Sequence, residues 1–208
     1  MPSFATRAGV IAWNAGRRIL VGLGTLVLPR RHVSGLSLVA LGLSEDPTAL
    51  FDRLSAALTL IQRHDPHRAA RLRRSLKRVL IVPSGAELYD HGIRSYLASA
   101  DLLRTRPPEA VALALAHEAT HAWLHTKRVR STADRLDRIE RLCIAQEIAL
   151  ARRLPDGAEW VTFAEQKLTR AWWGPQEGER RVDALATTLR VPGWLRSLRE
   201  RLFAGSGR

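Results

Sequence analysis

Cysteine is almost absent from this chain of 208 residues, and its scarcity excludes several kinds of site at once. Cys143 is the single cysteine. No disulfide can therefore form within the chain, and a zinc cage built from several cysteines is excluded. We expect a reducing compartment, the cytoplasm, as the location of the protein.

Acidic residues are scarce relative to basic ones. The chain has 20 Asp and Glu against 33 Lys and Arg, which gives a net charge of +13. An excess of this size attracts anionic partners such as nucleic acid, a membrane surface or an acidic protein. The arginines are spread along the chain, however, and neither a helix-turn-helix nor an interleaving of aromatic and basic residues is found. Solvated surface charge is the favoured interpretation, with an anionic partner as the alternative.

The chain also lacks an apolar run of transmembrane length. The run Ile19–Leu28 has about ten residues, whereas a membrane-spanning helix needs roughly twenty. Pro29 and Arg30 follow it in place of a small-residue cleavage site, which argues against a secretory signal. We expect a buried first element here. A helix lying in a membrane surface is the alternative, and it would make the protein membrane-peripheral.

What the chain does contain is the composition of an ordinary globular protein. Apolar residues make up 46% of it and charged residues 25%, and no repeat or long linker interrupts it. The length suits one domain with a real core. We predict a single domain over residues 1–208, with an N-terminal apolar segment over residues 1–45.

Helical patterns outnumber strand patterns along the chain. Asp65-Pro66 reads as a helix start, Tyr89–Gly92 as a turn, and Ser95–Leu103 as either a strand or a short helix. Strands are also predicted at Val33–Leu43 and Arg78–Pro83, and helices at Pro47–His64, Pro108–His125, Thr132–Leu154 and from Trp160 onward. The predicted fold class is α+β, dominated by helices, with a small β-sheet.

Residues 117–121 read His-Glu-Ala-Thr-His, late in a predicted buried helix. Side chains four residues apart lie on the same face of a helix, so His117 and His121 can converge on one metal ion. Glu118 is rotated toward the open position, where it can take a proton from a bound water. Buried histidines bonded to carbonyls are the alternative, but burying two imidazoles and a carboxylate without a partner is costly. We predict one Zn²⁺ per chain.

A zinc site with two histidines needs a third protein ligand and keeps its fourth position for water. Glu140 follows His121 after eighteen intervening residues. The connection Thr126–Ser131 is long enough to fold the next helix back and bring Glu140 to the metal. Glu147 lies two turns further along, about 10 Å on the helix axis. Only one of these two glutamates can be a ligand.

The pattern HExxH-x18-E over His117, His121 and Glu140 resembles that of gluzincin peptidases such as the large zinc aminopeptidases. The segments HEATHAWL and RIERLCIAQE are also similar to plant LIM-domain peptidases and to small uncharacterised bacterial zincin-like proteins. The resemblance covers roughly residues 78–155, which form the minimal metal-site core. It implies a zincin-like fold with a strand pair, an active-site helix and a glutamate helix. It further implies that Glu118 is the base, and it favours Glu140 over Glu147, which then orients a ligand histidine.

The chain departs from the aminopeptidase pattern in three places. Ile139-Glu140-Arg141 replaces Asn-Glu-Gly, the GxMEN motif is missing, and Ile144 stands where an acid would follow Glu140 by four residues. Recognition of a substrate N-terminus is therefore not supported. The class of peptide or protein substrate stays open.

Hydrolysis of a peptide also needs a hydrogen-bond donor for the oxyanion. Tyr89, Tyr96, His91 and His125 are the candidates, and the sequence does not choose among them. Ordinary core packing is the alternative for each tyrosine. Cys143 lies one turn after Glu140 and is interpreted as a packed small residue rather than a nucleophile.

The sequence thus predicts a zinc metallohydrolase that cleaves amide bonds with Glu118 as general base. Zincins hold an extended peptide on an edge strand, and Arg78–Pro83 or Ser95–Leu103 could take that part. One alternative is a zincin-like module that keeps the metal for binding or regulation with little turnover. Another is a basic protein that binds nucleic acid or membrane, with the motif incidental. Chelator-insensitive binding that weakens steeply with salt would mark that second alternative.

Overall fold

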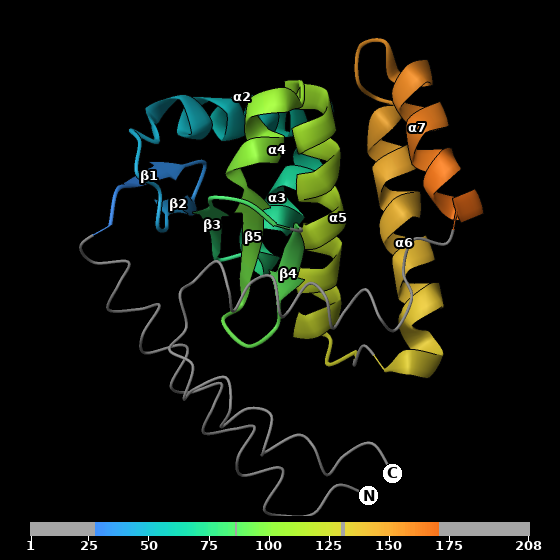
Figure 1. Cartoon of the computed structure of the whole chain (residues 1–208). Helices are drawn as coiled ribbons and strands as arrows, with labels where there is room; N and C mark the ends of the chain where they lie inside the picture. Colours follow the sequence, from blue (N-terminus) through green and yellow to red (C-terminus); the bar gives the residue numbers. More distant parts are fainter. Residues whose placement is uncertain (1–27, 86, 130–131, 171–208) are drawn as a thin grey trace, which may run out of the picture.

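The computed structural model describes residues 28–85, 87–129 and 132–170 (Figure 1). The strands are β1 (Arg30–Val33), β2 (Leu36–Ala40), β3 (Arg78–Val82), β4 (Leu88–Asp90) and β5 (Ser95–Ser99). The helices are α2 (Thr48–His64), α3 (Pro66–Ser75), α4 (Ala100–Thr105), α5 (Pro108–Thr126), α6 (Ala133–Ala151) and α7 (Gly157–Arg170). Helices dominate and the sheet is small, so the predicted α+β class is confirmed at that level.

The five strands form one sheet in the order β1-β2-β3-β5-β4. Strands β2, β3 and β5 run parallel, and the outer strands β1 and β4 pair antiparallel with their neighbours. Strands β3 and β5 are almost wholly buried, as expected for parallel strands that are covered on both faces. The prediction that Arg78–Pro83 or Ser95–Leu103 forms an edge strand is wrong, because both segments lie inside the sheet.

The edge nearest the HExxH helix is β4, which the sequence indicated only as a turn. Tyr89 pairs with Tyr96 of β5 across the antiparallel register. The open choice at Ser95–Leu103 resolves into both elements, since β5 ends at Ser99 and α4 begins at the next residue. Ser99 makes that switch locally, because its side chain accepts a hydrogen bond from the N–H of Leu102 and caps the helix.

Helix α5 lies in the middle of the fold. The sheet and helices α2, α3 and α4 lie on one side of it, and α6 and α7 lie on the other (Figure 1). Val111, Leu113 and Leu115 are buried on different faces of this helix. Neighbours therefore surround α5, and the prediction of a buried central helix is confirmed. The chain reverses after α5, so α6 returns alongside it and α7 packs behind α6.

Some predictions concern segments that the structure does not describe. The predicted first element at Ile19–Leu28 lies, apart from Leu28, outside the described residues, and so does the helical pattern beyond Arg170. Within the described part of the chain, no helix combines the length and the apolar character that crossing a bilayer requires.

Candidate metal centre

The candidate site is formed by facing side chains of α5 and α6. His117 and His121 lie one turn apart on α5, with ring centroids 5.0 Å apart. Glu140, Cys143 and Glu147 are spaced three and four residues apart on α6, which places them along one face of that helix. The antiparallel return of α6 brings this face against the two histidines.

Three donor groups converge between the helices. The Nε2 atoms of His117 and His121 are 3.2 Å apart. The Glu140 carboxylate faces both rings, with Oε2 3.2 Å from Nε2 of His117 and Oε1 3.4 Å from Nε2 of His121. Ligands bound at about 2.0–2.2 Å around a tetrahedral zinc ion lie roughly 3.3–3.5 Å from one another. The three groups thus have the spacing of three ligands on one tetrahedral face.

The polarity of these groups also favours a cation between them. Nδ1 of His117 is 2.5 Å from Oε1 of Glu147, and a carboxylate only accepts hydrogen bonds, so Nδ1 carries the proton. In a neutral His117, Nε2 then carries a lone pair, and this lone pair faces a second imidazole and a carboxylate. Lone pairs that converge in this way need a proton or a metal ion among them.

Without a metal, a proton on His117 meets that need. Burial alone would lower the pKa of His117, but its hydrogen bonds to Glu140 and Glu147 and the charge of Glu118 raise it to about 10. Burial would likewise raise the pKa of Glu140, yet the hydrogen bonds from His117 and His121 hold it well below its usual value. The site is therefore strongly attractive to positive charge.

Glu118 lies beside this cluster on α5. Its side chain is only 7% exposed, and among the described residues no donor is hydrogen-bonded to its carboxylate. An unpartnered buried carboxylate costs free energy unless a cation or a reacting proton compensates it. Glu118 thus adds a buried negative charge beside the donor cluster.

No match is found between this chain and models of known families, curated proteins or solved structures. The site is therefore interpreted from its own residues.

Cys143 is a fourth donor that the sequence interpretation underrated. Its thiol is fully buried against Leu124 and Ile139, as a packed residue would be. Its sulfur and one nitrogen from each of His117 and His121 nevertheless all lie within 4.8 Å of one another. Its spacing of three residues from Glu140 could have revealed this. Burial, together with nearby carboxylates, raises the pKa of the thiol. We prefer Glu140 as third ligand because its oxygens lie 3.2 and 3.4 Å from the Nε2 atoms of the two imidazoles.

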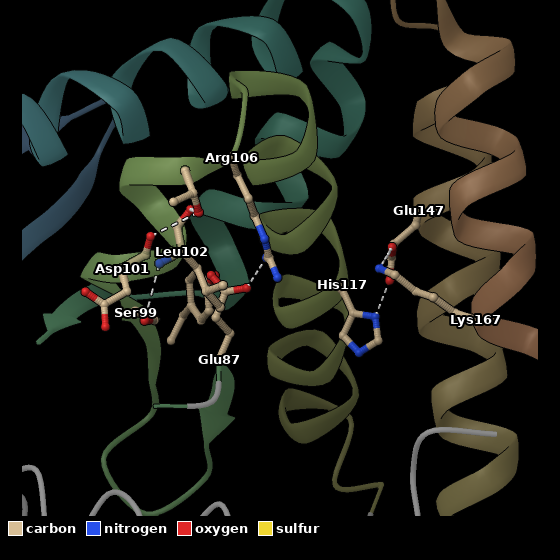
Figure 2. Close-up of polar contacts among 10 residues, drawn as sticks. Glu87, Ser99, Asp101, Leu102, Arg106, His117, Glu147 and Lys167 are labelled. Atoms are coloured by element: carbon tan, nitrogen blue, oxygen red, sulfur yellow. Dashed lines mark hydrogen bonds and ion pairs between the residues drawn. The ribbon is translucent and has the colours of Figure 1, made fainter. Parts of the chain in front are cut away.

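Glu147 and Lys167 extend the site away from the donor cluster (Figure 2). Glu147 is fully buried and contacts Nδ1 of His117 through Oε1, while its Oε2 accepts a hydrogen bond from Nζ of Lys167 on α7. Glu147 therefore lies where a residue that orients His117 must lie. Lys167 was missed by sequence reasoning, because nothing in its spacing relates α7 to the HExxH motif.

Three of the predicted oxyanion donors lie together beyond His121. The hydroxyl of Tyr89 on β4 is 3.0 Å from Nδ1 of His125, one turn further along α5. The ring of His91 stacks edge-on, 4.9 Å from His125 and 5.1 Å from Tyr89 between centroids. Desolvation among these rings, with the charges of His125 and His121, lowers the pKa of His91 to about 4. Edge strand β4 and the end of α5 thus share one polar cluster.

Tyr96 is directed elsewhere. It is fully buried, and its hydroxyl donates to Oε1 of Glu87 at 2.7 Å, while Glu87 also pairs with Arg106 (Figure 2). Burial and the charges of Glu87 and Glu118 raise the pKa of Tyr96 well above its usual value of 10. The Tyr96 hydroxyl is bonded to Glu87, whereas Tyr89 and His125 lie one turn beyond His121, which favours these two as oxyanion donors.

Proposed function

We propose that this chain is a zinc-dependent metallohydrolase of the zincin type that acts on peptide bonds. The observation that carries the proposal is the triangle of donors from His117, His121 and Glu140, with separations of 3.2–3.4 Å. The buried and unpartnered carboxylate of Glu118 beside that triangle supports it. A zinc site of catalytic type has three protein ligands and one open position.

The donor set fits zinc, since imidazole nitrogen and carboxylate oxygen are both ordinary zinc ligands. His117, His121 and Glu140 would hold the ion. When bound there, zinc polarises a substrate carbonyl and lowers the pKa of water toward neutrality. Glu147, through Nδ1 of His117, fixes the tautomer in which Nε2 presents a lone pair to the ion.

Glu118 is proposed to carry the proton in the reaction. Its carboxylate accepts a proton from the attacking water and returns it to the leaving nitrogen as the peptide bond breaks. The Tyr89 hydroxyl and the His125 imidazole, which contact each other at 3.0 Å, are the donors proposed for the carbonyl oxygen as it gains charge.

The edge strand β4 offers a place for the substrate backbone. It is the outermost strand on the side of the sheet nearest α5, and it carries Tyr89. An extended peptide can add to such an edge through backbone hydrogen bonds. We therefore propose β4, in place of the two interior segments, as the strand that aligns the peptide.

The test combines metal content with cleavage of a mixed peptide library. Wild-type protein is expected to contain about one zinc per chain and to cleave. Glu118→Gln should retain zinc and lose roughly 10²–10⁴-fold in rate, the usual contribution of a general base. Glu109→Gln, an equivalent change in the first turn of the same helix, should leave both unchanged. Absence of zinc after reconstitution would refute the proposal.

A second candidate function is a zinc-binding module with little turnover. The observation that favours it is the sulfur of Cys143, within 4.8 Å of the imidazole nitrogens. If the thiolate joined the other three ligands, four protein ligands would close the site, which is the pattern of structural zinc. Stoichiometric zinc without cleavage of any library peptide would support this function.

A further inference from the structure

Helix α7 contributes a cation to the candidate metal centre through Lys167. Nζ of Lys167 pairs with Oε2 of Glu147, whose other oxygen is 2.5 Å from Nδ1 of His117. Glu147 is 0% exposed, so with both partners in place its carboxylate is shielded from water. One unbroken chain of contacts therefore runs from α7 through α6 to the histidine on α5 (Figure 2).

The charges of the site explain why a lysine is placed there. Three carboxylates, Glu118, Glu140 and Glu147, are buried around two imidazoles. A divalent ion compensates two negative charges and leaves one. Within the described part of the chain, Lys167 is the only lysine or arginine that forms an ion pair with any of the three. It therefore compensates the remaining charge at Glu147, which lies outside the donor triangle and contacts Nδ1 of His117.

Lys167 is held in place by its own helix. Its ammonium lies 5.0 Å from the ring centroid of Phe163, one turn earlier on α7, and that ring contacts Trp160 edge-on. Phe163 is 45% exposed, which is unusual for a large apolar side chain. The cation–π contact accounts for this exposed ring, because the ring directs the ammonium toward Glu147.

We propose that Lys167 is a positioning residue for the metal centre, acting through Glu147 on the orientation of His117. This inference rests on the proposed function. The ammonium fixes the Glu147 carboxylate, the carboxylate fixes Nδ1–H of His117, and Nε2 is thereby turned toward His121 and Glu140. Outer contacts of this kind change metal affinity by about 10–100-fold when they are removed.

The experiment measures zinc affinity by competition with a chromophoric chelator and records the visible spectrum of the cobalt-substituted protein. Lys167→Met is expected to bind zinc about 10–100-fold more weakly and to shift the cobalt bands. Lys167→Arg keeps the charge and should restore most of the affinity. Lys77→Met removes the same charge at an exposed site between α3 and β3 and should match wild type.

The outcomes separate this inference from the proposed function. If wild type binds no zinc, both the proposed function and the role of Lys167 are refuted. If wild type binds zinc and Lys167→Met has the same affinity and cobalt spectrum, only the role of Lys167 falls. Should Lys167→Met fail to fold, Phe163→Leu keeps the ammonium and removes the ring beside it. A several-fold loss of zinc affinity in that variant would support the inference, and unchanged affinity would overturn it.

Discussion

At the residue scale, the third ligand is the choice on which the function depends. Glu140 and Cys143 lie one helical turn apart, and either can approach the two histidines. The sequence interpretation favoured Glu140 because the spacing HExxH-x18-E resembles that of gluzincin peptidases. It could not rank Cys143, because that requires the distance between α5 and α6. The position of Lys167 could not be predicted for the same reason, since it depends on how α7 packs against α6.

Substitution on α6 distinguishes the two donors. Glu140→Ala should weaken zinc binding by more than the roughly 10–100-fold that loss of an outer contact costs, whereas Cys143→Ser should bind zinc as wild type does. Glu147→Ala should keep the metal with reduced affinity. Chelator competition measures all three. A thiolate-to-cobalt charge-transfer band in the cobalt-substituted wild type, lost in Cys143→Ser, would contradict the assignment and favour the closed site.

At the element scale, a buried ion pair at the start of helix α3 is joined to α6 by a hydrogen bond. Asp65 caps α3 by accepting a hydrogen bond from the N–H of Arg68 at 2.9 Å, and it also pairs with the guanidinium groups of Arg68 and Arg153. Arg68 in turn donates to Gln146, next to Glu147 on α6. The Asp65-Pro66 start was visible in the sequence. The partners Gln146 on α6 and Arg153 just after α6 were not, since they lie far along the chain.

This network should make the free energy of unfolding depend on pH in the acidic range. Burial alone would raise the pKa of Asp65, but the hydrogen bonds from Arg68 and the charges of Arg68 and Arg153 hold it below its usual 3.8. Because the folded pKa is the lower one, the stabilisation is complete above about pH 4 and is lost as pH falls through the folded value. Asp65→Asn should cost roughly 3 kcal/mol at neutral pH, and less in acid.

Urea unfolding at several pH values measures this dependence. Asp52→Asn is the matched control, because Asp52 on α2 forms an exposed pair with Arg31 on β1. An exposed pair contributes about 0–1 kcal/mol, so that variant should remain close to wild type. A difference between Asp65→Asn and wild type that stays constant down to pH 2 would show that the pair does not titrate as described.

The edge strand β4 shows where local patterns fail at the element scale. Leu88–Asp90 has three residues, and the sequence around it reads as a turn because Asp90 and Gly92 follow one another closely. Its strand conformation comes from pairing with β5, which is a non-local contact. The sequence indicated β3 as a strand from its apolar character, and it indicated the segment that contains β5 as a strand or a short helix. Their interior positions depend on the strand order, which no local pattern encodes.

At the scale of the whole molecule, the metal-donor side chains come from α5 and α6, the helices that precede and follow the chain reversal. α5 packs on the sheet, and α6 reaches the site only by returning alongside α5. The sequence predicted this reversal from the short connection and the two helical patterns. A metal bound between α5 and α6 would tie that half of the molecule to the sheet.

Zinc is therefore expected to stabilise the whole fold. A ligand that binds only the folded state adds about 2.7 kcal/mol when its free concentration is 100 times its Kd. Calorimetry should show a higher Tm for the wild type with zinc than with a chelator, and the same increase for Glu118→Gln. His121→Ala should show no increase. An identical Tm for wild type in zinc and in chelator would contradict a metal between these helices.

The contact chain from Lys167 to His117 has a consequence for helix α7. Coupling between two sites is reciprocal, so whatever favours the docked position of α7 tightens metal binding, and the metal favours docked α7 by the same factor. The exposed ring of Phe163 lies on that helix beside the lysine. A protein that bound this ring and drew α7 away would therefore weaken metal binding without contacting His117, His121 or Glu140.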